Sequence, residues 1–132
     1  MKEIDIKVNF ELTNSDLNEL FFSAWKEHHW IDFIPMLSKS LVNISAFSKG
    51  NLIGFVNVAW DGGIHAFLLN TTVHRDWQRM GIGKKIIERA VTEAKERKVV
   101  WIHVDYKKKY RDFYRSCGFQ PTEAGLINTH NT

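Results

Sequence analysis

The stretch Val73–Ile87, VHRDWQRMGIGKKII, joins an apolar run to a helix-like run through two glycines one residue apart. The first N–H groups of a helix have no partner inside the helix, and the helix dipole adds partial positive charge there. Glycines at positions 81 and 83 leave room for an anion at such N–H groups, and basic side chains surround them: Arg79, Lys84 and Lys85. The same glycines also suit a plain turn with close packing of helix on strand, so both interpretations stay open.

Two familiar phosphate-binding loops do not fit this stretch. A P-loop needs a glycine five residues before its Gly-Lys pair and a Ser or Thr after it, but these positions hold Gln78 and Lys85. The dinucleotide fingerprint needs a third glycine where this chain has Ile86, and it belongs to the first strand of a parallel unit. A phosphate bound here would therefore be bound by another kind of loop.

The residues on either side predict a strand–helix–strand unit. Ile64–Val73 is an apolar strand before the loop, Gly81–Arg97 is an amphipathic helix, and Val99–Asp105 is a short apolar strand. The apolar stripe of the helix repeats at helical spacing: Ile82, Ile86, Ile87, Ala90, Val91 and Ala94. Such a unit places its two strands parallel, with a right-handed crossover between them.

The rest of the chain adds antiparallel strands and further helices. The short turns SKGN (48–51) and DGG (61–63) predict hairpins, because glycine lies where a hairpin needs it. The remaining expected elements are a strand at Glu3–Phe10, helices at about Thr13–Trp25, Ile31–Ser40 and Lys108–Ser116, strands at Val42–Ser48 and Leu52–Trp60, and a final strand that starts near Phe119, is interrupted at Pro121–Gly125 and resumes at Leu126–Thr129. Together they predict an α/β fold of the α+β type, with a mixed, mostly antiparallel sheet of six or seven strands and helices on both faces.

Length and composition predict one ordinary globular domain over residues 1–132. The chain is 44% hydrophobic and 25% charged, and no run approaches the roughly 20 apolar residues that span a bilayer. Its first residues, MKEIDIKVNF, carry charges among the apolar side chains, unlike a signal peptide. The single cysteine, Cys117, excludes an internal disulfide, so we expect a cytoplasmic location without membrane contact.

Charge and histidine spacing give little support to nucleic-acid or metal binding. A formal net charge of +3 suits an anionic ligand but is too small to predict nucleic-acid binding. The basic and aromatic run Tyr106–Arg115, YKKKYRDFYR, invites a nucleic-acid interpretation, yet charges at a helix start are more often a solvated face. The adjacent His28 and His29 lack the paired spacing of a zinc site, so no metal is expected.

Two motifs resemble those of the GCN5-related N-acetyltransferase (GNAT) superfamily. Gln78, Gly81 and Gly83 match its acyl-CoA-binding core, Gln/Arg-x-x-Gly-x-Gly/Ala. Val73 stands where that family has a valine closing its fourth strand, and FYRSCGF at Phe113–Phe119 is similar to its aromatic-Tyr pair followed by Gly-Phe. The order of the expected elements also agrees with the GNAT fold. WDGGIHAFLL, HVDY, FYRSCGF and PTEAGLI further resemble a small bacterial subgroup without a settled substrate.

The resemblance implies how the chain would hold acetyl-CoA as its acyl donor. The backbone N–H groups of the glycine loop would bind the CoA pyrophosphate: Arg79, Met80, Gly81, Ile82, Gly83 and Lys84, with Gln78 at the start of the loop. The end of the preceding strand, at Thr71 and Val73, would pair its backbone with the pantetheine arm. The Val73 N–H could also polarise the thioester carbonyl.

Tyr114 matches the tyrosine that donates a proton to the departing CoA thiolate in many members of the family. It could instead pack against the sheet with its hydroxyl on a backbone carbonyl. The residues leave the general base for the acceptor amine open, with His103 and Asp105 as the catalytic candidates because they share one strand face. Asp61 and His65 are further candidates, and any of the four could be a strand-end residue bonded to backbone.

The function that follows is acetyl transfer from acetyl-CoA to an amine acceptor, by direct attack in a ternary complex without an acyl-enzyme. A module of the same fold that binds CoA with little catalysis is the alternative. One departure from the family is Lys107, which stands where members often have an asparagine. The sequence does not identify the acceptor, and a homodimer is open to the chain because strands and aromatic residues near its C-terminus could pair.

Overall fold

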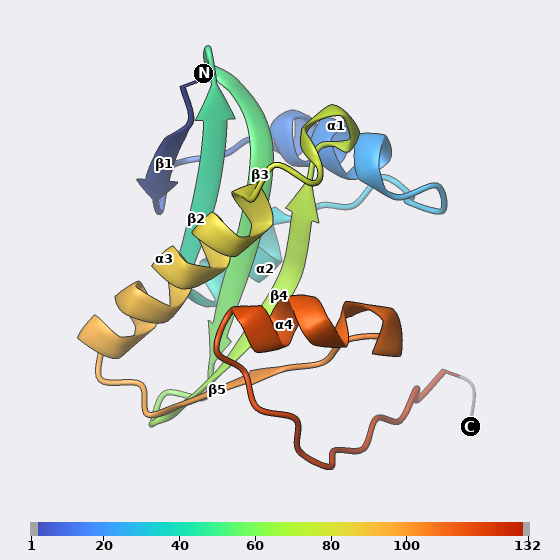
Figure 1. The fold of residues 1–132 in the computed structure, drawn as a ribbon. Coiled ribbons are helices and arrows are strands. Elements are labelled where there is room, and N and C mark those ends of the chain that lie inside the picture. The colour runs from blue at the N-terminus through green and yellow to red at the C-terminus, as the bar shows by residue number, and fades with distance from the viewer. Residues whose placement is uncertain (1–2, 131–132) are drawn as a thin grey trace.

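The computed structural model describes residues 3–130 and contains one mixed β-sheet (Figure 1). Its strands lie in the order β1-β2-β3-β4-β5. The first four pair antiparallel, and β5 pairs parallel with β4. Their bounds are Asp5–Val8 for β1, Ser40–Ser48 for β2, Asn51–Trp60 for β3, His65–Val73 for β4 and Trp101–Val104 for β5. The mixed, mostly antiparallel sheet expected from the sequence is confirmed.

The expectation of six or seven strands is wrong, because the described residues form a sheet of five. The missing strand is the final one: residues 119–128 contain no strand, and the side chains of Leu126 and Ile127 are 88% and 72% exposed. A strand needs a neighbour whose backbone groups it can pair with, and an apolar pattern alone does not supply one. This segment has the pattern but no partner strand within residues 3–130.

In the described part of the chain, four α-helices cover the two faces of the sheet (Figure 1). α1 (Asn14–Ala24) and α2 (Ile34–Ser38) lie on one face, whereas α3 (Ile82–Glu96) and α4 (Arg111–Ser116) lie on the other. Short 3-10 turns precede α3 and α4: η1 (Arg75–Trp77) and η2 (Lys108–Tyr110). The expected helices on both faces are therefore confirmed. No helix within residues 3–130 is both long and apolar enough to cross a lipid bilayer.

Local sequence explains where the helices begin. Thr13 caps α1 through a capping box, in which its Oγ1 accepts from the Asp16 N–H and the Asp16 carboxylate accepts from the Thr13 N–H, both at 3.1 Å. α2 is shorter than the expected Ile31–Ser40, because Pro35 in its first turn suits a helix start and not a helix interior.

Each face of the sheet has its own apolar core. The core under α3 consists chiefly of aliphatic side chains from the strands and the helix: Val42, Ile44, Ala46, Ile53, Val56, Val58, Ala66, Leu68, Ile82, Ile86, Ile87, Ala90 and Ala94. The core under α1 is richer in aromatic rings: Leu12, Leu17, Leu20, Phe21, Phe33, Phe47 and Phe55. β2 and β3 are thus buried on both faces along most of their length, which fixes their register.

Asn18 joins α1 to the segment that leads to α2. Its side chain is almost fully buried and donates to the carbonyls of Asn14 and Ile31, both at 2.8 Å. Its Oδ1 accepts from the Ile31 N–H at 2.9 Å and lies 2.9 Å from His28 Nε2. Burial lowers the pKa of His28, so its ring is neutral at pH 7 and can donate through Nε2 to this oxygen.

We expect Asn18→Ala to lower the free energy of unfolding by about 2 kcal/mol or more, because it leaves several backbone groups without partners. Urea denaturation followed by circular dichroism measures the effect. Glu19→Ala, at the exposed neighbouring position, is the matched control and should change stability by no more than about 0.5 kcal/mol. Equal stability of the two variants would contradict this role of Asn18.

Candidate active site

The parallel pairing of β4 with β5 is short. It joins His65–Leu68 to Trp101–Val104, and no pairing with β5 continues beyond Leu68. β4 itself runs on to Val73 and stays paired with β3 on its other side. The last residues of β4 therefore lie beside β3 but have no strand neighbour on the β5 side.

The loop after β4 is fastened to the strand end. The Gln78 side chain donates from Nε2 to the Val73 carbonyl at 3.0 Å, and the His74 N–H donates to the Ile53 carbonyl at 2.7 Å. Arg79 and Gly81 both have positive φ angles, 64° and 81°, so the chain turns sharply just before α3. These contacts hold residues 74–81 as one compact turn at the start of the helix.

The two glycines of this loop, Gly81 and Gly83, have different structural roles. Gly81 has a left-handed conformation, and a Cβ built on it would meet nothing within 4 Å, so its backbone lies open. A Cβ on Gly83 would lie 3.3 Å from Phe113 Cζ and 3.7 Å from Val73 Cγ2. The sequence left an anion site and close packing open as alternatives. The geometry supports close packing at Gly83 and leaves the space beside Gly81 free.

The start of α3 has the properties of an anion-binding site. Gly81 caps the helix without any side-chain hydrogen bond, and the first turn contains no acidic residue. The N–H groups of Ile82, Gly83 and Lys84 have no carbonyl four residues earlier within the helix to bond with. Arg79 and Lys85 are exposed next to them, and Lys84 is half-buried. Free N–H groups, the helix dipole and basic side chains all favour a negatively charged ligand here.

Tyr114 of α4 is buried on the α3 side of the sheet, with 8% of its surface exposed. Its ring stacks on Tyr106 at 4.9 Å between centroids, with 18° between the planes. Burial raises the pKa of the Tyr114 phenol, and a hydrogen bond with the Thr71 side chain acts against that rise. The phenol is consequently protonated at neutral pH and lies beside the unpaired end of β4.

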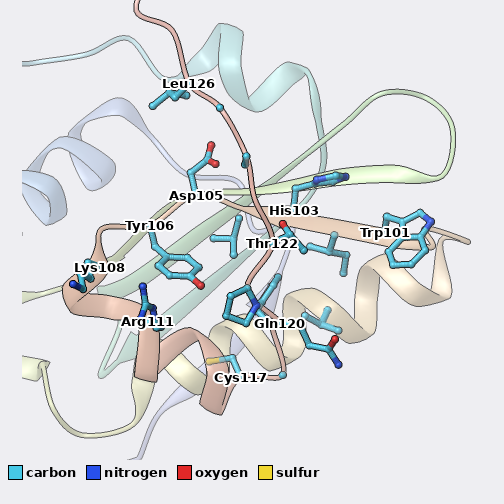
Figure 2. A pocket seen from close by; sticks show the side chains of 18 of the residues that line it. Trp101, His103, Asp105, Tyr106, Lys108, Arg111, Cys117, Gln120, Thr122 and Leu126 are labelled. Carbon is cyan, nitrogen blue, oxygen red and sulfur yellow. The ribbon is translucent and has the colours of Figure 1, made fainter.

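His103 and Asp105 lie on the opposite face of the sheet from Tyr114. Ile102 and Val104 pack into the core under α3, so the alternation of side chains turns His103 and Asp105 the other way. Figure 2 shows Asp105 and Tyr106 on opposite sides of the chain. The acid candidate and the base candidates are thus separated by the sheet.

The structure pairs His103 with His65 and does not pair it with Asp105. A hydrogen bond of 2.8 Å joins His65 Nδ1 to His103 Nε2, which requires one ring to carry the proton and the other to accept it. The His103 ring also stacks on Phe67, with centroids 4.8 Å apart. No hydrogen bond between His103 and Asp105 is found among the described residues, so the expected His–Asp pair is not formed there.

A groove of about 1080 Å³ runs along the outer side of β5 (Figure 2). His103, Asp105 and Tyr106 line it together with parts of α4 and of the segment after α4, but no residue of the glycine loop does. The groove is therefore a separate feature from the start of α3. Within residues 3–130, no group of three or more His, Cys, Asp or Glu side chains is gathered closely enough to hold a metal ion.

Three contacts at the site were not foreseen from the sequence. Tyr106 supports Tyr114, His65 bonds to His103, and Trp25 Nε1 donates to Thr72 Oγ1 at 3.0 Å. The contact between Tyr106 and Tyr114 could have been predicted from the sequence, because Tyr106 follows Val104 by two residues and therefore lies on the same strand face as Val104. The other two depend on strand register and on where α1 ends, which no local pattern specifies.

Comparison with known proteins identifies the family of this chain. The sequence model of the acetyltransferase (GNAT) family matches residues 10–119. The chain belongs to the GNAT family. The superfamily expected from the glycine loop and the FYRSCGF motif is thereby confirmed.

Two curated relatives of this GNAT protein are named as N-acetyltransferases. GCN5-related N-acetyltransferase 3, chloroplastic, of Arabidopsis thaliana is 35% identical over 93% of this chain and 52% of its own length. An uncharacterized N-acetyltransferase of Pyropia yezoensis is 24% identical over 95% of this chain and 75% of its own length. The chain thus spans about half of the first relative and three quarters of the second.

Solved structures show the same fold. A GNAT family acetyltransferase from Streptococcus pneumoniae TIGR4 superposes with a TM-score of 0.75 at 27% identity, covering 96% of this chain and 99% of that one. The aminoglycoside N-acetyltransferase AAC(6')-Iy, solved with a bisubstrate analogue containing CoA, gives a TM-score of 0.76 at 16% identity, with coverage of 96% and 97%. At that identity the second likeness establishes the fold alone.

The raised pKa of Tyr114 predicts a pH dependence of stability. The folded chain holds the phenolic proton to higher pH than the unfolded chain, whose tyrosines titrate at about 10. The raised pKa of Tyr114 therefore adds to the free energy of unfolding. This addition is complete below pH 10 and is lost as the pH rises from there toward the pKa of the folded state. We expect the free energy of unfolding to fall more steeply for wild type than for Tyr114→Phe between about pH 9 and about pH 11.

Urea denaturation of both proteins across this range tests the expectation. The Cys117 thiol, whose pKa is also raised by burial, is present in both proteins and cancels in the comparison. Parallel curves for the two proteins would show that Tyr114 titrates normally.

Proposed function

We propose that this GNAT protein transfers an acetyl group from acetyl-CoA to a primary amine by direct attack within a ternary complex. The observation that carries the proposal is the position of Tyr114, a buried and protonated phenol hydrogen-bonded to Thr71 at the unpaired end of β4. The anion-binding start of α3 follows that strand end in the chain. A reactive group and a phosphate site thus flank the same few residues.

The start of α3 is proposed to hold the CoA pyrophosphate. The N–H groups of the loop would bind its oxygens: Arg79, Met80, Gly81, Ile82, Gly83 and Lys84. The open backbone at Gly81 and the absence of acidic residues in the first turn of α3 support this assignment. Gln78 would act indirectly, because its side chain is engaged with the Val73 carbonyl and keeps the turn closed against the strand.

The end of β4 is proposed to hold the pantetheine arm and the thioester. Thr71 and Val73 lie where β4 has no strand neighbour on the β5 side, so an extended ligand has room to pair there as an added strand. The Val73 carbonyl already accepts from Gln78, which leaves the Val73 N–H as the group to polarise the thioester carbonyl.

Acetyl-CoA supplies an activated acyl group, and the protein supplies proton transfer on two sides of it. A C–N bond forms as the C–S bond breaks, and Tyr114 donates its proton to the departing thiolate. The amine must be neutral to attack and must lose a further proton afterwards. His103 and Asp105, on the opposite face of the sheet, are proposed to accept these protons directly or through water, since an attacking amine approaches from the side away from Tyr114.

The histidine pair suits such a base. One nitrogen of the His65–His103 hydrogen bond must accept, so at least one of the two rings is neutral in this arrangement. Asp105 is exposed and lines the groove beside His103, where its carboxylate would favour a cationic acceptor. The assignment of His103 and Asp105 as base candidates therefore stays, with His65 added as the partner of His103.

We expect Tyr114→Phe to lower kcat by roughly 10²-fold or more while leaving the Kd for acetyl-CoA unchanged, because only proton donation is lost. Thiol release with a panel of primary amines measures kcat, and calorimetry measures Kd. Tyr110→Phe, close by on η2, is the matched control and should retain full activity. Full activity of Tyr114→Phe would refute the general-acid role.

The same assay separates the enzyme from the alternative, a CoA-binding module with little catalysis. Saturation with acetyl-CoA and no product from any amine of the panel would favour the module.

We expect Gly81→Val to raise the Kd for CoA by about tenfold or more, since its side chain would fill the space proposed for the pyrophosphate. Gly62→Val is the matched control, because Gly62 has nearly the same φ, 84° against 81°, and equally open surroundings, but lies in the β3–β4 turn. Titration calorimetry with CoA compares the two variants. Equal affinities would mean that the loop does not hold the pyrophosphate.

A further inference from the structure

The hydrogen bond between His65 and His103 joins two strands on a part of the sheet that solutes can reach. In the register of β4 and β5, His65 lies opposite Trp101 and His103 lies opposite Phe67, so the two histidines are diagonal neighbours on one face. His103 is exposed and His65 is half-buried. The strand register thus holds the two imidazoles together, and the surface position leaves them open to a ligand.

When both rings are neutral, the pair can offer two nitrogen lone pairs to one cation. His65 Nδ1 and His103 Nε2 are 2.8 Å apart, with 5.1 Å between the ring centroids. No hydrogen bond within residues 3–130 engages the outer nitrogen of either ring. The proton between the rings can therefore move through water to an outer nitrogen. Both inner nitrogens are then unprotonated, and each ring is still neutral.

The separation of the two inner nitrogens favours a metal ion that takes its ligands at right angles. Two metal–nitrogen bonds of about 2.0–2.1 Å place their nitrogens about 2.9 Å apart at a right angle and about 3.3 Å apart at a tetrahedral angle. The observed 2.8 Å is close to the first value. The rings need only turn until both lone pairs point to one side of the line that joins them. Right-angled sites with imidazole ligands are typical of Cu²⁺ and Ni²⁺.

The surroundings of the pair favour a cation and restrain one of the rings. Asp61 lies next to His65, since its Oδ1 accepts from the His65 N–H at 3.3 Å. Asp105 follows His103 by two residues and projects from the same side of β5 (Figure 2). Phe67 stacks on the His103 ring, with 24° between the planes. The two carboxylates attract a divalent cation, and the stacked ring has less freedom to lose when it binds one.

We propose that His65 and His103 bind one divalent transition-metal ion, Ni²⁺ or Cu²⁺, through His65 Nδ1 and His103 Nε2, with water as the remaining ligands. Two protein ligands are fewer than the three or four of a catalytic or structural metal centre, so the ion is exchangeable and is not a resident cofactor. Its binding replaces the hydrogen bond between the two rings and does not depend on acetyl transfer.

For the proposed reaction, the bound ion is an inhibitor. It occupies the inner nitrogen of His103, the residue proposed to accept a proton from the amine. The outer nitrogen then carries the ring proton, so His103 has no lone pair left to accept another. This consequence rests on the proposed function, whereas the binding of the ion does not.

Titration calorimetry of the untagged full chain with NiCl₂ tests the site. We expect one Ni²⁺ per chain for wild type and a Kd at least about tenfold higher for His65→Gln and for His103→Gln, since each variant loses one arm of the chelate. His29→Gln changes an exposed histidine outside the pair and is the matched control, which should bind as wild type does. Circular dichroism verifies that all variants are folded. No binding by wild type, or equal affinity of wild type and His103→Gln, would overturn the proposal.

Two further measurements locate the ion and test its effect. Anomalous scattering from a crystal soaked in NiCl₂ should place nickel between the two rings, and nickel found only elsewhere would refute the site. In an assay of acetylated product, saturating NiCl₂ should lower kcat and EDTA should restore it, with MgCl₂ as the control because Mg²⁺ prefers oxygen ligands. Unchanged turnover with Ni²⁺ bound would refute the inhibition. Absence of turnover without any metal would refute the proposed function, and calorimetry would still decide the binding.

Discussion

The short parallel contact between β4 and β5 is the constraint on which the rest of the site depends. Four residue pairs join the strands, after which β4 continues beside β3 alone. Had the pairing continued to Val73, backbone hydrogen bonds would occupy the strand end and no ligand could reach it. Because it stops, Thr71 and Val73 are left between α3, which starts with free N–H groups, and α4, which brings Tyr114 to Thr71.

Much of this arrangement could be predicted from the sequence, because it depends on local signals. The apolar stripe of α3, the glycines of the loop and the hairpin turns each act within a few residues, and the structure has these elements within one to three residues of the expected ends. Part of the candidate site could be predicted from the same local signals. The sequence suggested an open backbone or close packing at the two glycines, and the structure has an open backbone at Gly81 and close packing at Gly83.

What the sequence could not supply depends on contacts between distant segments. The hydrogen bond between His65 and His103 follows from the register of two strands separated by a whole helix, and alternation along one strand suggested Asp105 as the partner. The prediction of a final strand was wrong for a related reason. The pattern at Leu126–Thr129 indicates a segment that is able to pair as a strand. Pairing also requires the exposed edge of another strand with a suitable position and direction, and the position of that edge depends on the folded structure.

The hydrogen bond from Trp25 to Thr72 has a mechanical consequence. Trp25 ends α1 on one face of the sheet, whereas Thr72 lies between the two residues of β4 that border the gap beside β5. Any ligand that spreads or straightens the end of β4 must move Thr72 and therefore strain or break this bond. The end of α1 is thus coupled to the strand end by this hydrogen bond, and the Arg75 N–H, which donates to Ser23 Oγ at 3.4 Å, joins α1 to the turn that follows β4. A ligand that displaces the end of β4 would therefore disturb the end of α1, and by reciprocity a change at the end of α1 would alter the binding of that ligand.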